Sequence, residues 1–201
     1  MIRVLLADDE NLIRSALAAL LGLEDDLAVV AEAASAGEAL AMARAHAPDV
    51  AVLDLQLPDR DGISLAADLA AVVPGCGLVI VTGHGRPGHL KRALEAGVRG
   101  FLPKTVSSAV LTTVVRTVHG GGRYVDPELA AEAISAGDSP LTPREADILE
   151  LAAGGAPVDE IATKAHLSPG TVRNHLSAAA AKLGAPNRHA AVAEARRHGW
   201  I

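Results

Sequence analysis

Short apolar runs that alternate with amphipathic helical patterns are the feature that most constrains the fold of residues 1–119. Runs rich in leucine and β-branched residues occupy positions 2–7, 27–31, 50–53, 78–82 and 100–102. Their apolar character is nearly continuous, which is typical of strands buried on both faces of a parallel sheet. Five such strands, each followed by a helix, predict a doubly wound, flavodoxin-like α/β domain.

The segments between these runs carry helix signals. Ser35 followed by Glu38 is a capping box, and Pro87 stands at a predicted helix start. Residues 107–118 are rich in Thr and Val, which favours a strand, but their apolar positions fall on helical spacing. We predict a helix there because hydrophobic periodicity is the stronger signal.

Polar residues follow four of the five predicted strands. Asp8 and Asp9 end the first strand, Asp54 ends the third, Thr82 ends the fourth, and Lys104 follows the fifth. The carboxyl ends of parallel strands meet at one edge of a sheet, where such folds place their active sites. The sequence therefore predicts that these five side chains lie close together.

Carboxylates gathered at one edge repel one another unless a cation lies among them. Hard oxygen ligands suit Mg²⁺, which can bridge and neutralise a phosphoryl group. A carboxylate on the central strand, Asp54, is the best candidate nucleophile for forming an aspartyl-phosphate. Lys104 and Thr82 would supply a positive charge and a hydroxyl donor to the phosphoryl oxygens.

Residues 1–119 resemble the receiver domain of two-component response regulators. The motifs that carry the resemblance are VLLADDE (4–10), VAVLDLQLPDRDG (50–62), VIVTG (79–83) and GFLPK (100–104). The resemblance implies that Asp54 is the phosphoacceptor. It also implies that Asp9 binds Mg²⁺ directly, that Asp8 assists through water, and that the backbone carbonyl of Gln56 is a further ligand. Thr82 and Lys104 would be the switch pair, and Phe101 the rotating switch aromatic. Thr105 departs from the pattern, because receivers often carry proline directly after the switch lysine.

Residues 120–140 have the composition of a linker, with glycines at the start and a Gly137-to-Pro140 stretch at the end. A helix over 127–135 is expected inside it. The 141–201 segment then predicts a small all-α domain whose first helix begins with a capping box at Thr142. A short helix, a turn at 166–167 and a longer helix over 169–183 form a helix-turn-helix pattern.

Charge distribution favours nucleic acid as the partner of this last domain. The whole chain has a net charge of −6, but residues 163–201 carry six Lys and Arg against one acidic residue. Arg173, Asn174 and Ser177 point away from the expected buried stripe and are candidate base contacts. The candidate phosphate contacts are Ser168, Thr171, Lys182 and Arg188. A plain four-helix bundle with a polar outer face remains the alternative.

The segments 141–155, 161–185 and 187–201 resemble the LuxR-type helix-turn-helix domain. A receiver followed by this domain is the arrangement of the NarL/FixJ family. The resemblance implies a phosphorylation-controlled transcription regulator that binds double-stranded DNA. It also implies that a sensor histidine kinase phosphorylates this regulator. The regulator would form a homodimer through receiver helices 1 and 5 and through the last helix of the DNA-binding domain. The alanines at 178–181 replace a bulkier and a basic residue, so we expect a shallow salt dependence of DNA binding.

Two other functions fit parts of the sequence. One is a phosphotransferase or phosphatase similar to the haloacid dehalogenase group, but the acidic pattern after the first strand differs and no cap domain is evident. The other is a constitutive DNA-binding protein with a vestigial receiver. The lone Cys76, the absence of a signal-peptide pattern, and no uncharged run long enough to cross a bilayer indicate a cytoplasmic protein.

Overall fold

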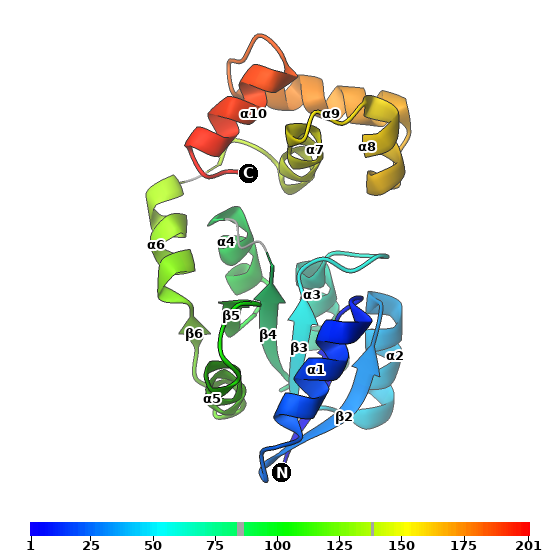
Figure 1. Cartoon of the computed structure of the whole chain (residues 1–201), viewed down its shortest axis with the longest axis vertical. Helices are drawn as coiled ribbons and strands as arrows, with labels where there is room; N and C mark the ends of the chain where they lie inside the picture. The colour runs from blue at the N-terminus through cyan, green and yellow to red at the C-terminus, as the bar shows by residue number, and fades with distance from the viewer. Residues whose placement is uncertain (84–86, 138) are drawn as a thin grey trace. The chain divides into compact units, whose positions relative to one another are not determined.

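The computed structural model describes residues 1–83, 87–137 and 139–201. The chain forms two compact units. Of the described residues, 1–83 and 89–130 belong to the first, and 87–88, 131–137 and 139–201 belong to the second. The first unit is an α/β domain and the second is all-helical, as predicted (Figure 1).

A six-stranded parallel sheet is the centre of the first unit. The strand order is β2-β1-β3-β4-β5-β6, and every neighbouring pair is parallel. The bounds are β1 Ile2–Ala7, β2 Leu27–Ala33, β3 Val50–Asp54, β4 Gly77–Thr82, β5 Gly100–Pro103 and β6 Tyr124–Val125. Strand β2 lies on one side of β1, and β3 and the later strands lie on the other. The topological switch point of this doubly wound sheet is therefore at the carboxyl ends of β1 and β3.

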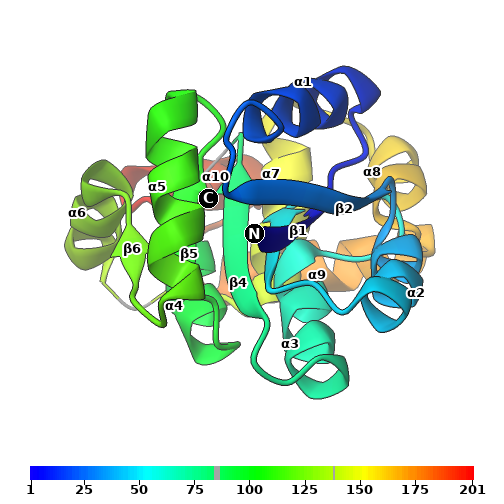
Figure 2. The ribbon, with the colours of Figure 1, turned by 90° about the horizontal axis from the view of Figure 1, so that it is seen from below.

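Five helices cover the two faces of this sheet. They are α1 (Asn11–Leu21), α2 (Ala36–His46), α3 (Gly62–Val72), α4 (Pro87–Glu95) and α5 (Ser108–His119). Helices α1 and α5 lie on one face, and α2, α3 and α4 lie on the other (Figure 2). The strands β3 and β4 are buried at every position, which explains why their sequences are continuously apolar.

The core beneath α1 and α5 is aliphatic. Val4, Val52 and Val79 from three neighbouring strands pack against Leu21 of α1 and Val114 of α5. The helical spacing of the apolar residues in 107–118 therefore reflects a buried face, and the predicted helix is confirmed, with Ser107 as its N-cap. Tertiary burial outweighs the strand propensity of Val and Thr in this segment.

The helix that was predicted to begin at Ser35 is also confirmed. The hydroxyl of Ser35 accepts a hydrogen bond from the Glu38 N–H at 3.2 Å. The Glu38 carboxylate returns to the N–H of Ala34 at 2.7 Å rather than to that of Ser35. The predicted capping box is thus displaced by one residue on its second hydrogen bond.

The segment predicted as a linker contains two elements. Strand β6 pairs with β5 in the register Gly100 with Tyr124, and this short strand was not predicted. Helix α6 (Pro127–Ala136) follows it and was predicted over nearly the same residues. Residues 120–130 pack with the first unit, so the compact unit extends beyond residue 119. Position 138 of the predicted linker lies outside the described residues.

After the end of α6, the described residues of the second unit form four helices: α7 (Pro143–Ala153), α8 (Val158–Ala165), α9 (Pro169–Lys182) and α10 (Arg188–Arg197). Thr142 and Glu145 form the predicted capping box of α7. The turn between α8 and α9 passes through His166, which adopts the left-handed conformation with φ of 53°. Ile148, Ile161, Val172 and Ala191 bring all four helices into one apolar core.

Among the described residues, no helix combines the length and the apolar character that crossing a membrane requires.

Candidate functional sites

Three carboxylates and one ammonium group meet at the carboxyl edge of the sheet. Asp8 and Asp54 are almost fully buried at the ends of β1 and β3, and Glu10 joins them from the start of α1. Nζ of Lys104 lies 2.8 Å from Oδ2 of Asp8, 2.9 Å from Oδ2 of Asp54 and 3.1 Å from Oε1 of Glu10. We call Asp8, Glu10, Asp54 and Lys104 the acidic cluster. The predicted meeting of Asp8, Asp54 and Lys104 is therefore observed.

Strands β4 and β5 fix the position of Lys104. Thr82 pairs with Pro103 in the parallel ladder, and the backbone N–H of Lys104 donates to the carbonyl oxygen of Thr82 at 2.8 Å. The ladder thus continues one residue beyond β5, and Thr105 follows where proline was expected. Thr82 is buried at this edge, and Phe101 is buried inside the sheet domain.

Burial and mutual charge set the protonation of the cluster. Removal from water raises the pKa of Asp54 above its usual value, and the hydrogen bond from Lys104 offsets only part of this effect. Burial would lower the pKa of Lys104, but hydrogen bonds to Asp8 and Asp54 outweigh it and raise the pKa above the ordinary range. Lys104 therefore stays charged and shares one positive charge among three carboxylates.

Two further magnesium ligands were predicted, the Asp9 carboxylate and the backbone carbonyl of Gln56. Asp9 is exposed and is not a member of the acidic cluster, whereas its neighbour Glu10 is. Gln56 is exposed, and its backbone N–H donates to Oδ1 of Asp54 at 3.3 Å. The roles of Asp9 and of the Gln56 carbonyl remain predictions.

Glu10 and Arg14 are two residues that the sequence analysis missed. Nη1 of Arg14 donates to the backbone carbonyl of Asp8 at 2.6 Å, and its Nη2 donates to Asn11 at 2.8 Å. Arg14 therefore holds the loop that carries the acidic residues after β1. Its position three residues after Asn11, on the same face of α1, is the sequence signal that could have indicated it.

The loop after Asp54 folds back, so that α3 begins against the end of β3. The Gly62 N–H donates to the Leu55 carbonyl at 2.8 Å, and Asp61 caps α3 by accepting from the N–H groups of Ile63 and Ser64. A Cβ atom at Gly62 would collide with the carbonyl oxygen of Asp54. Glycine is thus required here by a close approach of two backbones.

The donor set fits a small divalent cation. The carboxylate oxygens of Asp8, Glu10 and Asp54 lie within 4.8 Å of one another, and hard oxygen ligands of this kind suit Mg²⁺. One ammonium group leaves the acidic cluster with an excess of negative charge, which a divalent ion would neutralise.

Helix α9 presents three of the predicted DNA contacts to solvent. Arg173, Asn174 and Ser177 are exposed, whereas Val172, Leu176 and Ala179 are buried against the other helices. The predicted division of α9 into a buried stripe and a polar face is therefore confirmed. Ser168 is the N-cap, and its hydroxyl lies 2.8 Å from that of Thr171.

The other two predicted contacts, Lys182 and Arg188, already have partners within the second unit. Nζ of Lys182 lies 2.7 Å from Oε2 of Glu145, a buried carboxylate in the capping box of α7. Nη1 of Arg188 donates to the carbonyl oxygen of Ala156 at 3.2 Å. Both side chains thus join α9 or α10 to the segments around α7, a role that charge patterning alone did not reveal.

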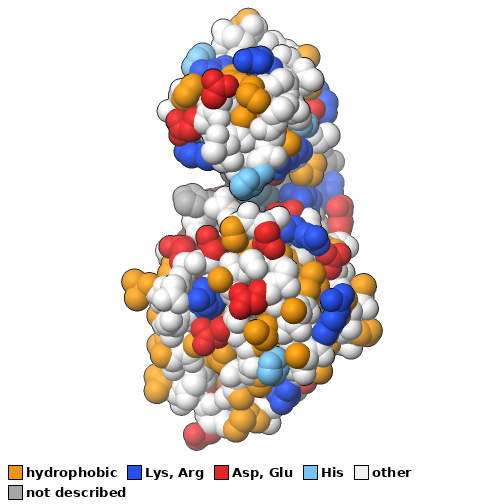
Figure 3. Space-filling view, turned by 90° about the vertical axis from the view of Figure 1, so that its right-hand side faces the viewer, with side chains coloured by type: hydrophobic (Ala, Val, Ile, Leu, Met, Phe, Trp, Pro, Cys, Tyr) orange, Lys and Arg blue, Asp and Glu red, His pale blue; other side chains and the backbone are white. Residues whose placement is uncertain are grey.

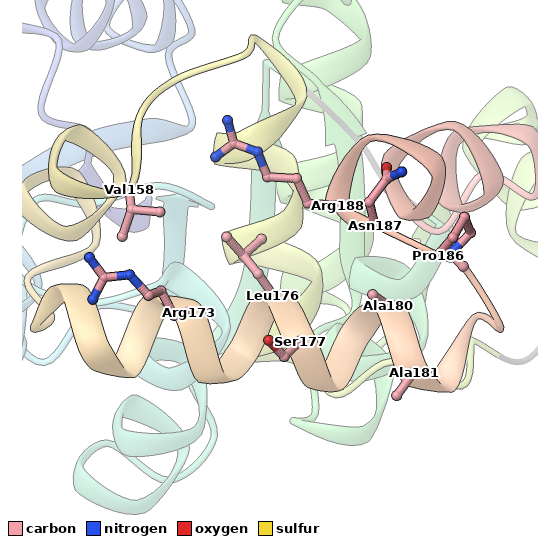
Figure 4. A pocket seen from close by; sticks show the side chains of 10 residues that line it. Val158, Arg173, Leu176, Ser177, Ala180, Ala181, Pro186, Asn187 and Arg188 are labelled. Carbon is pink, nitrogen blue, oxygen red and sulfur yellow. The ribbon is translucent and has the colours of Figure 1, made fainter.

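An open groove of about 660 Å³ runs along α9 toward the start of α10. Figure 4 shows Arg173 reaching toward Val158 at the start of α8, with Leu176, Ala180 and Arg188 along the same side of α9. Two guanidinium groups therefore flank a largely apolar floor. On the face of the molecule shown in Figure 3, basic and acidic side chains are interspersed.

Comparisons with known proteins match both units. The response regulator receiver domain matches residues 4–116, and the luxR family of bacterial regulatory proteins matches residues 139–195. The transcriptional regulatory protein DesR of Bacillus subtilis is 37% identical over 201 residues, covering 100% of each chain. The transcriptional regulatory protein UhpA of Escherichia coli is 41% identical over 187 residues, covering 93% of this chain and 94% of its own.

A solved structure extends the likeness to three dimensions. The response regulator ChrA of a haem-sensing two-component system is 34% identical, with a TM-score of 0.58 over 100% of this chain and 98% of its own. The receiver and luxR-family matches, together with DesR, are those of a response regulator transcription factor and not of a conventional enzyme. The chain belongs to the two-component response regulators with a receiver domain and a LuxR-type DNA-binding domain, and it is a DNA-binding transcriptional regulator.

Proposed function

We propose that phosphorylation of Asp54 controls DNA binding by α9. The observation that carries this proposal is the buried Asp54 carboxylate, which faces Lys104 at 2.9 Å at the carboxyl edge of the sheet. A nucleophile held beside a fixed positive charge is suited to attack an electrophilic phosphorus and to stabilise the product. We assign residues 1–119 to the receiver, 120–140 to the linker and 141–201 to the DNA-binding domain.

In the proposed reaction a carboxylate oxygen of Asp54 forms a bond to phosphorus, and the bond between phosphorus and the leaving group of the donor breaks. The donor is a phosphohistidine of a sensor histidine kinase or a small acyl phosphate, and its leaving group takes the electron pair. Mg²⁺, which we propose is held by Asp8, Asp9, Asp54 and the Gln56 carbonyl with Glu10 nearby, would neutralise charge on the phosphoryl oxygens.

After transfer, Lys104 and Thr82 supply the response. Lys104 exchanges its carboxylate partners for a phosphoryl oxygen, and the Thr82 hydroxyl turns toward another. The backbone N–H of Lys104 donates a hydrogen bond to the Thr82 carbonyl at the end of β4, so we expect the two residues to move together. Phe101, already buried on β5, is the aromatic side chain we propose as part of this switch.

On the DNA side, we propose that α9 enters the major groove. Arg173 and Asn174 have the donor geometry that reads guanine and adenine, and Ser177 lies one turn further along the same exposed face. Ser168, Thr171 and Arg188 are proposed phosphate contacts. Lys182 can contribute without leaving Glu145, because its ammonium group has two further donors.

We also propose that the regulator acts as a homodimer in the cytoplasm. Most of the apolar stripe of α5 is used by the core of its own unit, so a partner receiver would meet the exposed Leu12 and Leu20 of α1 beside α5. In α10, Ala191 and Ala195 are buried, and Ala193 is exposed for a partner helix. A two-fold dimer predicts paired half-sites about 10 bp apart. Footprinting that finds single isolated half-sites would contradict this arrangement.

Incubation with acetyl phosphate and Mg²⁺ tests the central step. The full-length chain should gain the mass of one phosphoryl group, and the Asp54→Ala variant should not. An equal gain in Asp54→Ala would place the phosphoacceptor elsewhere, and no gain in the wild-type chain would support a vestigial receiver. Steady product release from varied phosphoesters would instead favour an enzyme.

A further inference from the structure

Glu10 occupies a helix-capping position without capping the helix. It is the N-cap residue of α1, and its side chain makes no hydrogen bond to the first turn. Short side chains such as Ser or Asp are preferred at this position because they reach the free N–H groups. The Glu10 carboxylate extends instead to Nζ of Lys104, 94 residues away in the sequence, at 3.1 Å.

The backbone around Glu10 is fixed from both sides. Its N–H donates to Oδ1 of Asp8 at 2.9 Å, and its carbonyl accepts from the Arg14 N–H at 2.9 Å. Arg14 also binds the Asp8 carbonyl through its guanidinium group. The Glu10 side chain is 59% exposed, so its carboxylate lies at the mouth of the acidic cluster, outside the buried Asp8 and Asp54.

We propose that Glu10 is a positioning residue that holds Lys104 before phosphorylation and, through its charge, favours entry of the divalent cation while opposing entry of the anionic phosphodonor. This inference rests on the proposed phosphorylation of Asp54. The contact of Glu10 with Lys104, together with its exposure at the mouth, carries it.

A single variant at this position should bind the cation more weakly and yet accept the phosphoryl group faster. Replacing Glu10 by Gln removes a negative charge beside the oxygen ligands, so the cation binds more weakly. The same change removes repulsion of the donor and one of the three carboxylate partners of Lys104, so transfer becomes faster once the cation site is saturated. At a separation of a few ångströms in a largely aqueous setting, each effect should be about threefold to fivefold.

The experiment measures both quantities on the full-length chain. Magnesium affinity is measured by calorimetric titration of the unphosphorylated protein. The initial rate of Asp54 phosphorylation is measured by mass spectrometry with acetyl phosphate at saturating Mg²⁺. The variants are Glu10→Gln, Glu10→Asp as the charge-conserving rescue, and Asp25→Asn as a matched control. Asp25 is an exposed carboxylate in the loop before β2, at the opposite edge of the sheet.

We expect Glu10→Gln to raise the dissociation constant for Mg²⁺ and to raise the phosphorylation rate, each about threefold to fivefold. Glu10→Asp should lie closer to wild type, and Asp25→Asn should match wild type in both. Equal values for Glu10→Gln and wild type, changes of affinity and rate in the same direction, or an equal effect of Asp25→Asn would overturn the inference. Failure of the wild-type chain to be phosphorylated would count against the proposed function instead, and the magnesium titration would still test Glu10.

Discussion

Nζ of Lys104 lies 2.9 Å from Oδ2 of Asp54, although 50 residues separate them in the sequence. The same ammonium group also lies 2.8 Å from Oδ2 of Asp8. Before phosphorylation, Lys104 therefore supplies the positive charge that allows two buried carboxylates to share one edge of the sheet. A phosphoryl group on Asp54 would offer Lys104 a stronger partner, which links the chemistry to movement at the ends of β4 and β5.

Replacing Lys104 by Met should destabilise the first unit. The side chain of Lys104 is 12% exposed, and its removal leaves Asp8 and Asp54 facing each other without a cation. We expect a loss of about 2 kcal/mol in the free energy of unfolding, less than for a fully enclosed pair because the cluster opens to solvent at Glu10. Urea denaturation in EDTA measures the loss. An unchanged free energy of unfolding would show that the observed ion pairs contribute nothing.

Replacing Asp54 by Asn should stabilise the metal-free protein at neutral pH. Burial raises the pKa of Asp54, so the folded state binds its proton more tightly than the unfolded state does. The stability from this group is present below the pKa of the unfolded chain, about 3.9, and is lost as the pH rises through the folded pKa. Asn mimics the neutral acid.

Thermal unfolding in EDTA at pH 7 measures the effect, with Asp25→Asn as the control. The melting temperature of Asp54→Asn should exceed that of wild type at pH 7, and the difference should shrink on acidification. A lower melting temperature than wild type at pH 7 would mean that the bond to Lys104 outweighs the cost of burying the charge.

Replacing Gly62 by Ala should disrupt the close approach of α3 to the backbone of Asp54. The added methyl group meets the carbonyl oxygen of Asp54, and backbone cannot move aside as a flexible side chain can. We expect a cost of about 1 to 3 kcal/mol, together with slower phosphorylation. Gly88→Ala is the matched control, because a Cβ at Gly88 meets nothing within 4 Å inside α4. Equal stability of the two variants would refute the steric argument.

Replacing Lys182 by Met should destabilise the second unit in a pH-dependent way. Burial would raise the pKa of Glu145, but the hydrogen bonds from Lys182 and Thr142 lower it below its usual value. Such a group contributes stability above its unfolded pKa, about 4.3, and loses it as the pH falls through the folded pKa. We expect a loss of about 1 to 2 kcal/mol at pH 7 that fades in acid. Chemical denaturation followed by fluorescence of the single Trp200, which packs on this core, measures it. A loss that stays constant down to pH 3 would contradict the assigned pair.

Much of the fold could be predicted because buried strands and amphipathic helices leave strong patterns. The strand at 2–7 has the predicted bounds, and the helix predicted over 107–118 spans residues 108–119. Both are set by burial on a sheet. Strand β6 could not be predicted, because two residues after three glycines carry no periodicity and only the free edge of β5 gives them a partner.

The sequence predicts the location of the acidic cluster, but it does not predict every side chain in it. Strand ends located Asp8, Asp54 and Lys104, since topology alone brings them to one edge. Which of Asp9 and Glu10 turns inward depends on the path of the backbone after β1, which Arg14 holds. In the same way, charge indicated a basic face on the second unit, but only packing shows that Lys182 meets Glu145.

The measurement that tests the account most directly is DNA affinity with and without phosphorylation. Duplex DNA selected from a random pool is titrated with the wild-type chain, with Asp54→Ala and with Arg173→Ala, each before and after treatment with acetyl phosphate and Mg²⁺. We predict that phosphorylation tightens wild-type binding at least about tenfold, that Asp54→Ala does not respond, and that Arg173→Ala binds weakly in both states. Wild-type affinity that is unchanged by a confirmed phosphoryl group on Asp54 would contradict the account.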